Sequence, residues 1–277
     1  MKTTQRDILR AHTTVARTLA TAAWVAALCG SYACGGSAPE AKTGTQSPSA
    51  VTPSAATSPS ASGPSLPSSD LSDNAGVAFR ADFSAPELGQ PWNVFGAQSG
   101  NRQVKGGPEG LWVKIAQAEK SWDAVGARTA KVKIDGDFDL RGRFRDFSAK
   151  GNGSAKLIVV DAATTKAEAA YVERIQIDGK NLFKFGGDVG GSLENWGFAP
   201  TDVDRGDLRL ARQGNTLRAY TRPDERSSWT EFAPAQPAPK TMPRVVKFGV
   251  KLSSETNLSA QVRWVDLTMN GQIIRSE

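Results

Sequence analysis

The sequence predicts an all-β domain, an antiparallel β-sandwich, over residues 75–277. Long stretches of helical periodicity are missing, and short segments in which apolar and polar residues alternate recur instead. Turn-forming residues separate these segments. All 11 Phe and six of the seven Trp lie in this part, and about 200 residues suffice for one well-buried core. A dozen short strands without intervening helices are typical of a single sandwich.

Alternation and turn residues place the strands in order. The candidates are Val77–Phe83, Gly110–Ala116, Ala124–Ile134, Asp137–Phe147, Ala155–Asp161, Ala169–Asp178, Asn181–Gly186, Asp207–Arg212, Thr216–Arg222, Trp229–Phe232, Arg244–Leu252 and Ser259–Met269. Among the predicted turns are Asp135-Gly136, Asp178-Gly179, Gly214-Asn215 and Asn270-Gly271. Residues 188–206 alternate little, so we expect a long loop there.

The first 33 residues have the pattern of an export signal. Residues 1–17 are polar and basic, and Thr18–Ala33 carries no charge. At 16 residues this apolar stretch is short for a membrane span, which needs about 20. Small residues at Ser31 and Ala33 fit the −3 and −1 positions of a cleavage site before Cys34.

Residues 31–35 (SYACG) also resemble a bacterial lipobox, in which the cysteine becomes the lipidated first residue of the mature protein. The resemblance implies lipidation of Cys34 and a membrane anchor at the bacterial cell envelope. Ser31 stands where the pattern prefers Leu, which leaves an ordinary cleaved signal as the alternative. In a Gram-negative cell, Gly35 after the cysteine implies the outer membrane, because the acidic residue typical of inner-membrane retention is missing.

Residues 34–74 form a tether between this signal and the domain. They are mostly Ser, Pro, Thr, Ala and Gly without an aromatic residue, so we expect disorder. As a coil the segment spans roughly 35 Å. The predicted organisation is therefore a signal peptide (1–33), a disordered tether (34–74) and a β-sandwich (75–277).

Residue counts exclude several functions of the domain. His12, Cys29 and Cys34 are the only His and Cys residues, so Ser-His-Asp or Cys-His catalysis and His- or Cys-ligated metals are excluded after Cys34. Half of the net charge of +6 lies in residues 1–33. The mild excess that remains gives no reason to expect a nucleic-acid partner.

Three pieces of the domain stand out: Phe79–Ser84 with Trp92, Ile134–Leu140, and the hairpin Leu208–Tyr220 with residues 229–231 after it. Together they resemble the concanavalin A-like lectin/glucanase superfamily, in its poorly characterised bacterial extracellular branch. In the hairpin, Leu208 and Leu210 alternate inward and the Gly-Asn turn reverses the chain. The resemblance implies a jelly roll of two packed antiparallel sheets, without by itself implying sugar binding.

The carboxylates argue against hydrolysis. Catalytic members of the laminarinase group of this superfamily carry Glu-x-Asp-x-x-Glu or Glu-x-Asp-x-Glu on one strand, and neither string occurs here. The nearest is Glu168–Glu173, whose odd spacing is expected to turn the two acids to opposite faces. We therefore expect binding without catalysis, while acids from different strands leave a glycosidase or lyase open.

Two acidic strings are weak calcium candidates, because legume-type members of the superfamily bind calcium. Asp135 and Asp137 belong to one, and Asp202 and Asp204 to the other. The first lacks the glycine that a helix–loop–helix calcium loop needs at its sixth position, since Leu140 stands there. An acidic turn is the simpler interpretation of both, so no cofactor is expected beyond a possible calcium ion.

Basic and aromatic residues supply the candidate ligand contacts. Arg141, Arg143 and Arg145 alternate with Leu140, Gly142 and Phe144, which predicts an arginine row on one sheet face. Arg209, Arg218, Tyr220 and Arg222 are expected to line a second basic face. Either a groove for an anionic or hydroxylated polymer or a salt-bridged outer face, for example to Asp139 or Glu173, fits this pattern. Trp112, Trp229 and Trp264 are expected in the core, whereas Trp122 and Trp196 in polar contexts are candidate sugar platforms.

Two main hypotheses follow. The first is a surface-anchored, lectin-like β-sandwich, expected to be a monomer, that binds a polysaccharide, a glycan or another extracellular polymer. The second is a structural or protein-interaction module of the cell envelope, which a large exposed apolar patch would indicate.

Overall fold

The computed structural model describes residues 77–97, 100–163, 168–189 and 191–275. Within these ranges the regular secondary structure is entirely β, which confirms the predicted all-β class. They contain no apolar helix of membrane-spanning length. Cys34, the predicted signal peptide and the predicted tether lie outside the described residues.

The strands follow one another along the whole domain. Their bounds are β1 (Phe79–Arg80), β2 (Trp92–Phe95), β3 (Arg102–Lys105), β4 (Leu111–Ile115), β5 (Asp123–Thr129), β6 (Val132–Ala149), β7 (Gly153–Asp161), β8 (Glu168–Ile177), β9 (Lys180–Val189), β10 (Ser192–Pro200), β11 (Gly206–Gln213), β12 (Thr216–Arg222), β13 (Thr230–Glu231), β14 (Gln236–Pro237), β15 (Val245–Ser254) and β16 (Ala260–Arg275).

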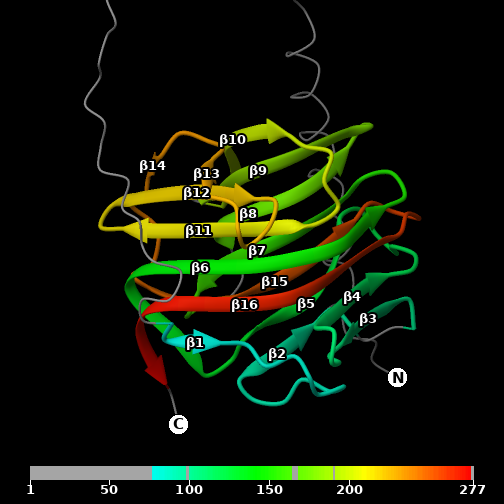
Figure 1. Cartoon of the computed structure of the whole chain (residues 1–277), viewed down its shortest axis with the longest axis horizontal. Coiled ribbons are helices and arrows are strands. Elements are labelled where there is room, and N and C mark those ends of the chain that lie inside the picture. The colour runs from blue at the N-terminus through cyan, green and yellow to red at the C-terminus, as the bar shows by residue number, and fades with distance from the viewer. Residues whose placement is uncertain (1–76, 98–99, 164–167, 190, 276–277) are drawn as a thin grey trace, which may run out of the picture. The chain divides into compact units, whose positions relative to one another are not determined.

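The strands form two packed antiparallel layers (Figure 1). The β8 sheet runs β10-β9-β8-β7-β15-β5-β2. The β6 sheet runs β12-β11-β6-β16, with β13 and β14 beside β12 and with β1 and β4 beside β16. The layers are joined where Val245 and Val246 of β15 pair with Asp135 and Ile134 of β6. This is the antiparallel β-sandwich that the sequence predicts.

One continuous hydrophobic core lies between the two sheets. Leu140 and Phe144 of β6 and Leu157 of β7 are fully buried in it. Gly142 faces the same core, and a Cβ atom there would lie 2.5 Å from a methyl carbon of Leu157. Alternation therefore turns the neighbouring residues, Arg141 and Arg143, to the outer face of the β6 sheet.

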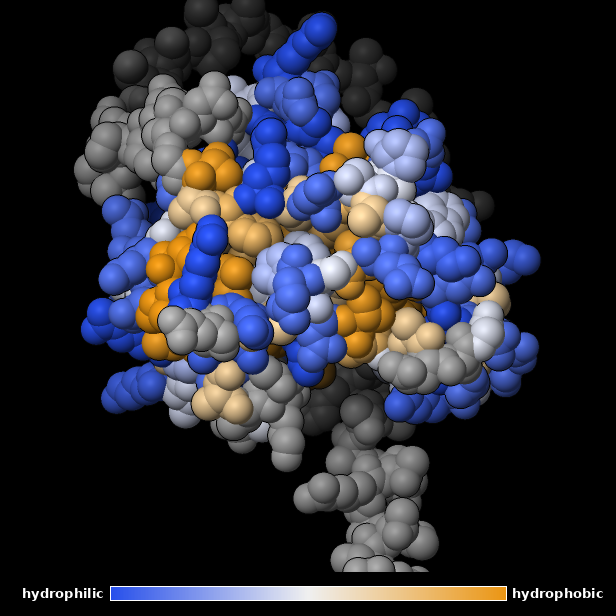
Figure 2. Space-filling model, turned by 90° about the horizontal axis from the view of Figure 1, so that it is seen from below, coloured by the Kyte–Doolittle hydropathy of each residue, from blue (hydrophilic) through white to orange (hydrophobic). Residues whose placement is uncertain are grey.

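The edge of the sandwich at β1 and β2 has a mixed surface. Figure 2 shows this edge with hydrophobic residues in separate areas among hydrophilic ones. Among the described residues, the large apolar side chains that are exposed are Val77, Trp122, Leu193, Phe198 and Ile274. Leu193 and Phe198, at 67% and 65% exposed, both lie on β10.

Several predicted boundaries are wrong. The loop expected over 188–206 contains β10, which has an irregular register at Trp196 and so shows little alternation. The turns expected at Asp135-Gly136 and Asn270-Gly271 are irregularities inside the long paired strands β6 and β16. Gly136 and Gly271 adopt φ of +78° and +148° there, so glycine serves a bulge and not a reversal.

A bulge in β8 overturns the expected placement of its two acids. Val159 pairs with Ala170 and Val160 with Glu168, so Ala169 is the extra residue. Ala169 and Ala170 both belong to the core. Because the extra residue shifts the alternation by one, Glu168 and Glu173 lie on the same outer face and not on opposite faces.

Candidate functional site

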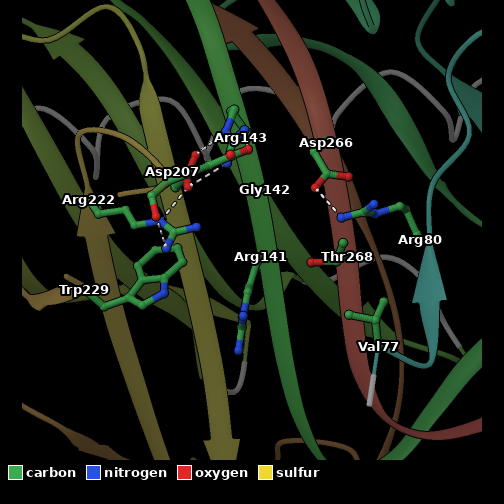
Figure 3. A pocket seen from close by; sticks show the side chains of 11 residues that line it. Val77, Arg80, Arg141, Gly142, Arg143, Asp207, Arg222, Trp229, Asp266 and Thr268 are labelled. Carbon is green, nitrogen blue, oxygen red and sulfur yellow. Dashed lines mark hydrogen bonds and ion pairs between the residues drawn. The ribbon is translucent and has the colours of Figure 1, made fainter. Parts of the chain in front are cut away.

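A hollow of about 280 Å³ lies on the outer face of the β6 sheet (Figure 3). We call it the arginine pocket. Strands β1, β6, β11, β12 and β16 and the segment after β12 contribute to it. Its lining consists of Val77, Arg80, Arg141, Gly142, Arg143, Asp207, Arg222, Glu225, Trp229, Asp266 and Thr268.

Strand register assembles the pocket from residues far apart in the chain. Asp207 of β11 lies opposite Arg143 of β6 on one side and opposite Arg222 of β12 on the other. Asp266 of β16 lies opposite Arg143, and Thr268 opposite Arg141. Cations and acids therefore alternate across the sheet, from Arg222 through Asp207 and Arg143 to Asp266.

Asp207 is a buried carboxylate shared by two guanidinium groups. Arg143 donates from Nε to Oδ1 of Asp207 at 2.7 Å and from Nη2 to Oδ2 at 3.2 Å. Arg222 donates from Nε to Oδ2 at 2.6 Å. The Asp207 side chain is 4% exposed and that of Arg143 27%. Asp207 thus holds the Arg143 guanidinium in place from its buried side, while part of that guanidinium faces the pocket.

Trp229 lies against the arginines and not in the core. The guanidinium carbon of Arg222 lies 4.4 Å from its ring centroid and that of Arg209 lies 5.7 Å away. The core assignment of Trp229 is therefore wrong, as is that of Trp112, which is half-buried beneath Arg263 at 4.9 Å. Trp264 is fully buried, as predicted.

The predicted second basic face is part of the first one. Arg209 lies opposite Arg141 and Tyr220 opposite Arg209, so both predicted rows lie on one side of one sheet. Asp139 takes paired hydrogen bonds from Arg141 and from Arg209. Arg218 bonds Glu231 instead, at 2.9 Å. Salt bridges link much of this face, and the arginine pocket is a hollow within it.

The two tryptophans predicted as sugar platforms, Trp122 and Trp196, do not lie beside the arginines of the pocket. Trp122 directly precedes β5 and is 39% exposed. Trp196 lies on β10, packs edge-on against Phe185 at 5.0 Å and donates to Glu194 at 3.2 Å. Strands β9, β8, β7 and β15 separate β10 from β5 in the β8 sheet. The candidate ligand contacts therefore fall into three places.

The calcium candidates have other partners. Asp135 forms an ion pair with Arg244, and Asp137 accepts a hydrogen bond from the backbone N–H of Gly214 at 2.7 Å. Asp204 pairs with Arg205, and Asp202 acts electrostatically on Arg174. Over the described ranges no group of three or more acidic residues is arranged to hold a metal ion.

The outer face of the β8 sheet carries a second charged cluster. Nζ of Lys156 lies 3.3 Å from both Glu168 and Glu173, Lys184 lies 3.4 Å from Glu173, and Lys251 pairs with Glu168. Burial alone would raise the pKa of Glu168, but Lys156 and Lys251 lower it below its ordinary value. Glu168 is thus held in the ionised form.

The alternation of β6 indicated Arg141 and Arg143, but it gave no sign of Trp229, Glu225 or Asp266 as pocket residues. Trp229 stands beside short β13, where alternation gives no direction. Only the pairing of β6 with β11 and β16 identifies the acids that face these arginines. In β8, the adjacent alanines before Tyr171 were the available signal of the bulge.

Comparisons with known proteins place the chain in a family. Residues 64–276 match the family model described as "Protein of unknown function (DUF1583) C domain". No curated protein matches the sequence.

Solved structures share its fold. The VIP36 exoplasmic/lumenal domain in metal-free form has a TM-score of 0.51 at 10% identity, over 71% of this chain and 92% of that one. A GH43 glycoside hydrolase reaches 0.53 at 15%, over 71% of this chain and 41% of that one. The CBM2 module of Dit from Lactobacillus casei BL23 phage J-1 reaches 0.50 at 9%, over 70% and 94%. At 15% identity or less, these likenesses show the β-sandwich fold and nothing finer.

Proposed function

This chain belongs to the family described as "Protein of unknown function (DUF1583) C domain", and we propose, from the pocket described above, that it is a carbohydrate-binding β-sandwich. The observation that carries the proposal is the arginine pocket. Arg80, Arg141 and Arg143 present donors there, and Asp266 and Thr268 present acceptors. A ligand rich in hydroxyl groups needs donors and acceptors at short intervals, which this alternation supplies.

The rigidity of the pocket supports binding. Arg143 is held by two hydrogen bonds to buried Asp207, and Arg141 by Asp139. Side chains fixed before the ligand arrives lose little conformational freedom on binding. The fold supports the same proposal, because a CBM2 module and a glycoside hydrolase share it.

We propose that binding occurs without turnover. Glycoside hydrolysis needs one protonated carboxylic acid beside a second carboxylate. Glu168 and Glu173 are close enough to share Lys156, but the lowered pKa of Glu168 removes the proton that an acid catalyst would donate. In the arginine pocket, Asp207 has arginines on both sides and Asp266 pairs with Arg80.

We further propose that Cys34 carries a lipid that anchors the chain at the bacterial cell envelope, at the outer membrane in a Gram-negative cell. The lipobox-like segment 31–35 and the Ser/Pro-rich composition of residues 34–74 support this address. A tether of that composition would hold the sandwich clear of the membrane surface.

A protein-interaction module is the second candidate function. It is favoured by Leu193 and Phe198, which are both well exposed on the edge strand β10. Exposed apolar side chains on an edge strand suit a protein partner better than a sugar.

The experiment compares the full chain with Arg143→Gln on a panel of immobilised neutral and acidic polysaccharides. We expect retention of the wild type on at least one polymer and about tenfold weaker binding by Arg143→Gln, which loses a charge-assisted donor. Arg222 remains to compensate Asp207, so the variant should fold. Arg244→Gln is the control, because Arg244 is also paired to an aspartate but lies outside the pocket. Equal retention of all three proteins, or none on any polymer, would refute the proposal.

A further inference from the structure

The arginine pocket contains one well-exposed carboxylate, that of Glu225. Asp207 lies between Arg143 and Arg222, so two guanidinium cations share one buried anion. Glu225 supplies the second anion by pairing with Nη1 of Arg143. Nη1 is the part of the guanidinium left over when Nε and Nη2 bond Asp207. The pocket therefore has a fixed position for a carboxylate.

Glu225 occupies that position from an exposed segment between β12 and β13. Its side chain is 65% exposed, whereas that of Asp207 is 4% exposed. The segment is shaped by Asp224, whose Oδ1 accepts from the backbone N–H groups of Arg226 and Ser227 at 2.8 and 3.0 Å. Arg222 also donates to the backbone carbonyl of Glu225 at 3.3 Å. The Glu225 carboxylate is thus free to leave Arg143 without loss of the turn.

We propose that the arginine pocket binds an acidic sugar, a uronate unit of a polysaccharide, whose carboxylate replaces that of Glu225 on Arg143. Glu225 then acts as a built-in competitor that occupies the position when no ligand is bound. This inference rests on the proposed function and names its ligand class.

The rest of the pocket favours a uronate over an acidic peptide. Asp266 of β16 lies opposite Arg143 of β6, with its carboxylate 3.4 Å from Arg80, and Thr268 follows on the same face. A second carboxylate directly beside the one on Arg143 would meet Asp266 and be repelled, whereas the hydroxyl groups of the same uronate ring can donate to Asp266 and Thr268. One carboxylate with several hydroxyl groups is the composition of a uronate.

The test measures binding of the full chain to polygalacturonate and to its carboxyl-reduced, neutral counterpart. Glu225→Gln should bind polygalacturonate about three- to tenfold more tightly than the wild type, because the competing carboxylate is gone. Its affinity for the neutral polymer should not change. Glu109→Gln is the matched control, since Glu109 is 64% exposed and paired with Arg263 outside the pocket. It removes the same charge without freeing Arg143.

Each outcome decides a different point. Equal affinity for both polymers, or no gain in Glu225→Gln beyond that in Glu109→Gln, overturns the inference. If Arg143→Gln still weakens binding, the proposed function survives that result. No binding of either polymer overturns the inference, while the proposed function is refuted only if the whole panel of polysaccharides fails to retain the chain. Equally tight binding of polyglutamate overturns the assignment to a sugar and leaves a carboxylate site for peptides.

Discussion

At the scale of single residues, side chains on the outer faces of the sheets carry the account. Alternation on β6 predicted that Arg141 and Arg143 share one face, and they do. It gave no information on which acids would meet them, because that depends on the strands beside β6. Asp207 and Glu225 therefore emerged only from the structure, 64 and 82 residues after Arg143 in the chain.

Trp229 shows a second limit of prediction at this scale. Tryptophan in a sandwich core is the usual expectation, and Trp264 satisfies it. Trp229 instead packs on the guanidinium of Arg222, which is itself 8% exposed. A cation over an indole ring provides the apolar cover that a core would give. Residue type alone does not distinguish these two environments.

Cys34 is the single residue on which the proposed address depends. Cys34→Ser removes the only thiol that the lipobox-like segment offers for acylation. We expect the variant to lose membrane fractionation and incorporation of labelled palmitate, while the soluble chain remains intact. Cys29→Ser is the control, because Cys29 follows Leu28 and lacks the small residue expected before a modified cysteine. Unchanged partitioning of Cys34→Ser would refute the lipid anchor.

At the scale of elements, a bulge in strand β8 explains why the spacing of Glu168 and Glu173 led to a wrong prediction of their faces. Six residues from Glu168 to Glu173 in regular alternation would end on opposite faces. The bulge at Ala169 adds one residue, so both acids reach Lys156. Bulges depend on the partner strand, and the sequence of β8 alone does not determine one. Similarly, Gly136 and Gly271 signalled turns that are bulges in the structure.

The cluster on β8 predicts how stability depends on pH. The pKa of Glu168 in the folded chain lies below its ordinary value of 4.5, where Lys156 and Lys251 outweigh burial. Its contribution to folding is therefore complete above about pH 4.5 and is lost as the pH falls through the lowered pKa. We expect the free energy of unfolding, measured in urea from pH 6 to pH 3, to fall over the acidic part of that range.

Glu168→Gln removes the titrating group and should flatten this fall. The control is Glu109→Gln, in which an exposed, ion-paired glutamate is changed. An identical dependence of the free energy of unfolding on acid pH in the wild type and Glu168→Gln would contradict this explanation.

At high pH the same cluster loses its stabilising effect through Lys156. Burial alone would lower the pKa of Lys156, but Glu173 and Glu168 raise it above 10.5. The contribution of Lys156 to stability therefore persists up to that pH and is lost at higher pH.

At the scale of the whole molecule, sequence patterns were sufficient for the fold class and most strands. A sandwich core needs only apolar residues at the right period, and the sequences of β4, β11 and β12 carry that period clearly. The arginine pocket was not predictable in the same way. It unites β1 with β16, whose residues Arg80 and Asp266 are 186 positions apart. Such a site depends on topology and register together.

The most informative experiment identifies which tryptophan of the domain lies next to the bound ligand. The indole N–H resonances of the ¹⁵N-labelled full chain would be followed by NMR during titration with the polysaccharide that the binding panel identifies. Trp229→Phe assigns the pocket resonance. We expect the indole resonance of Trp229 to shift on binding, while those of Trp122 and Trp196, which lie elsewhere on the sandwich, do not. Shifts of Trp122 or Trp196 with an unmoved Trp229 would contradict this expectation, because the ligand would then lie outside the arginine pocket.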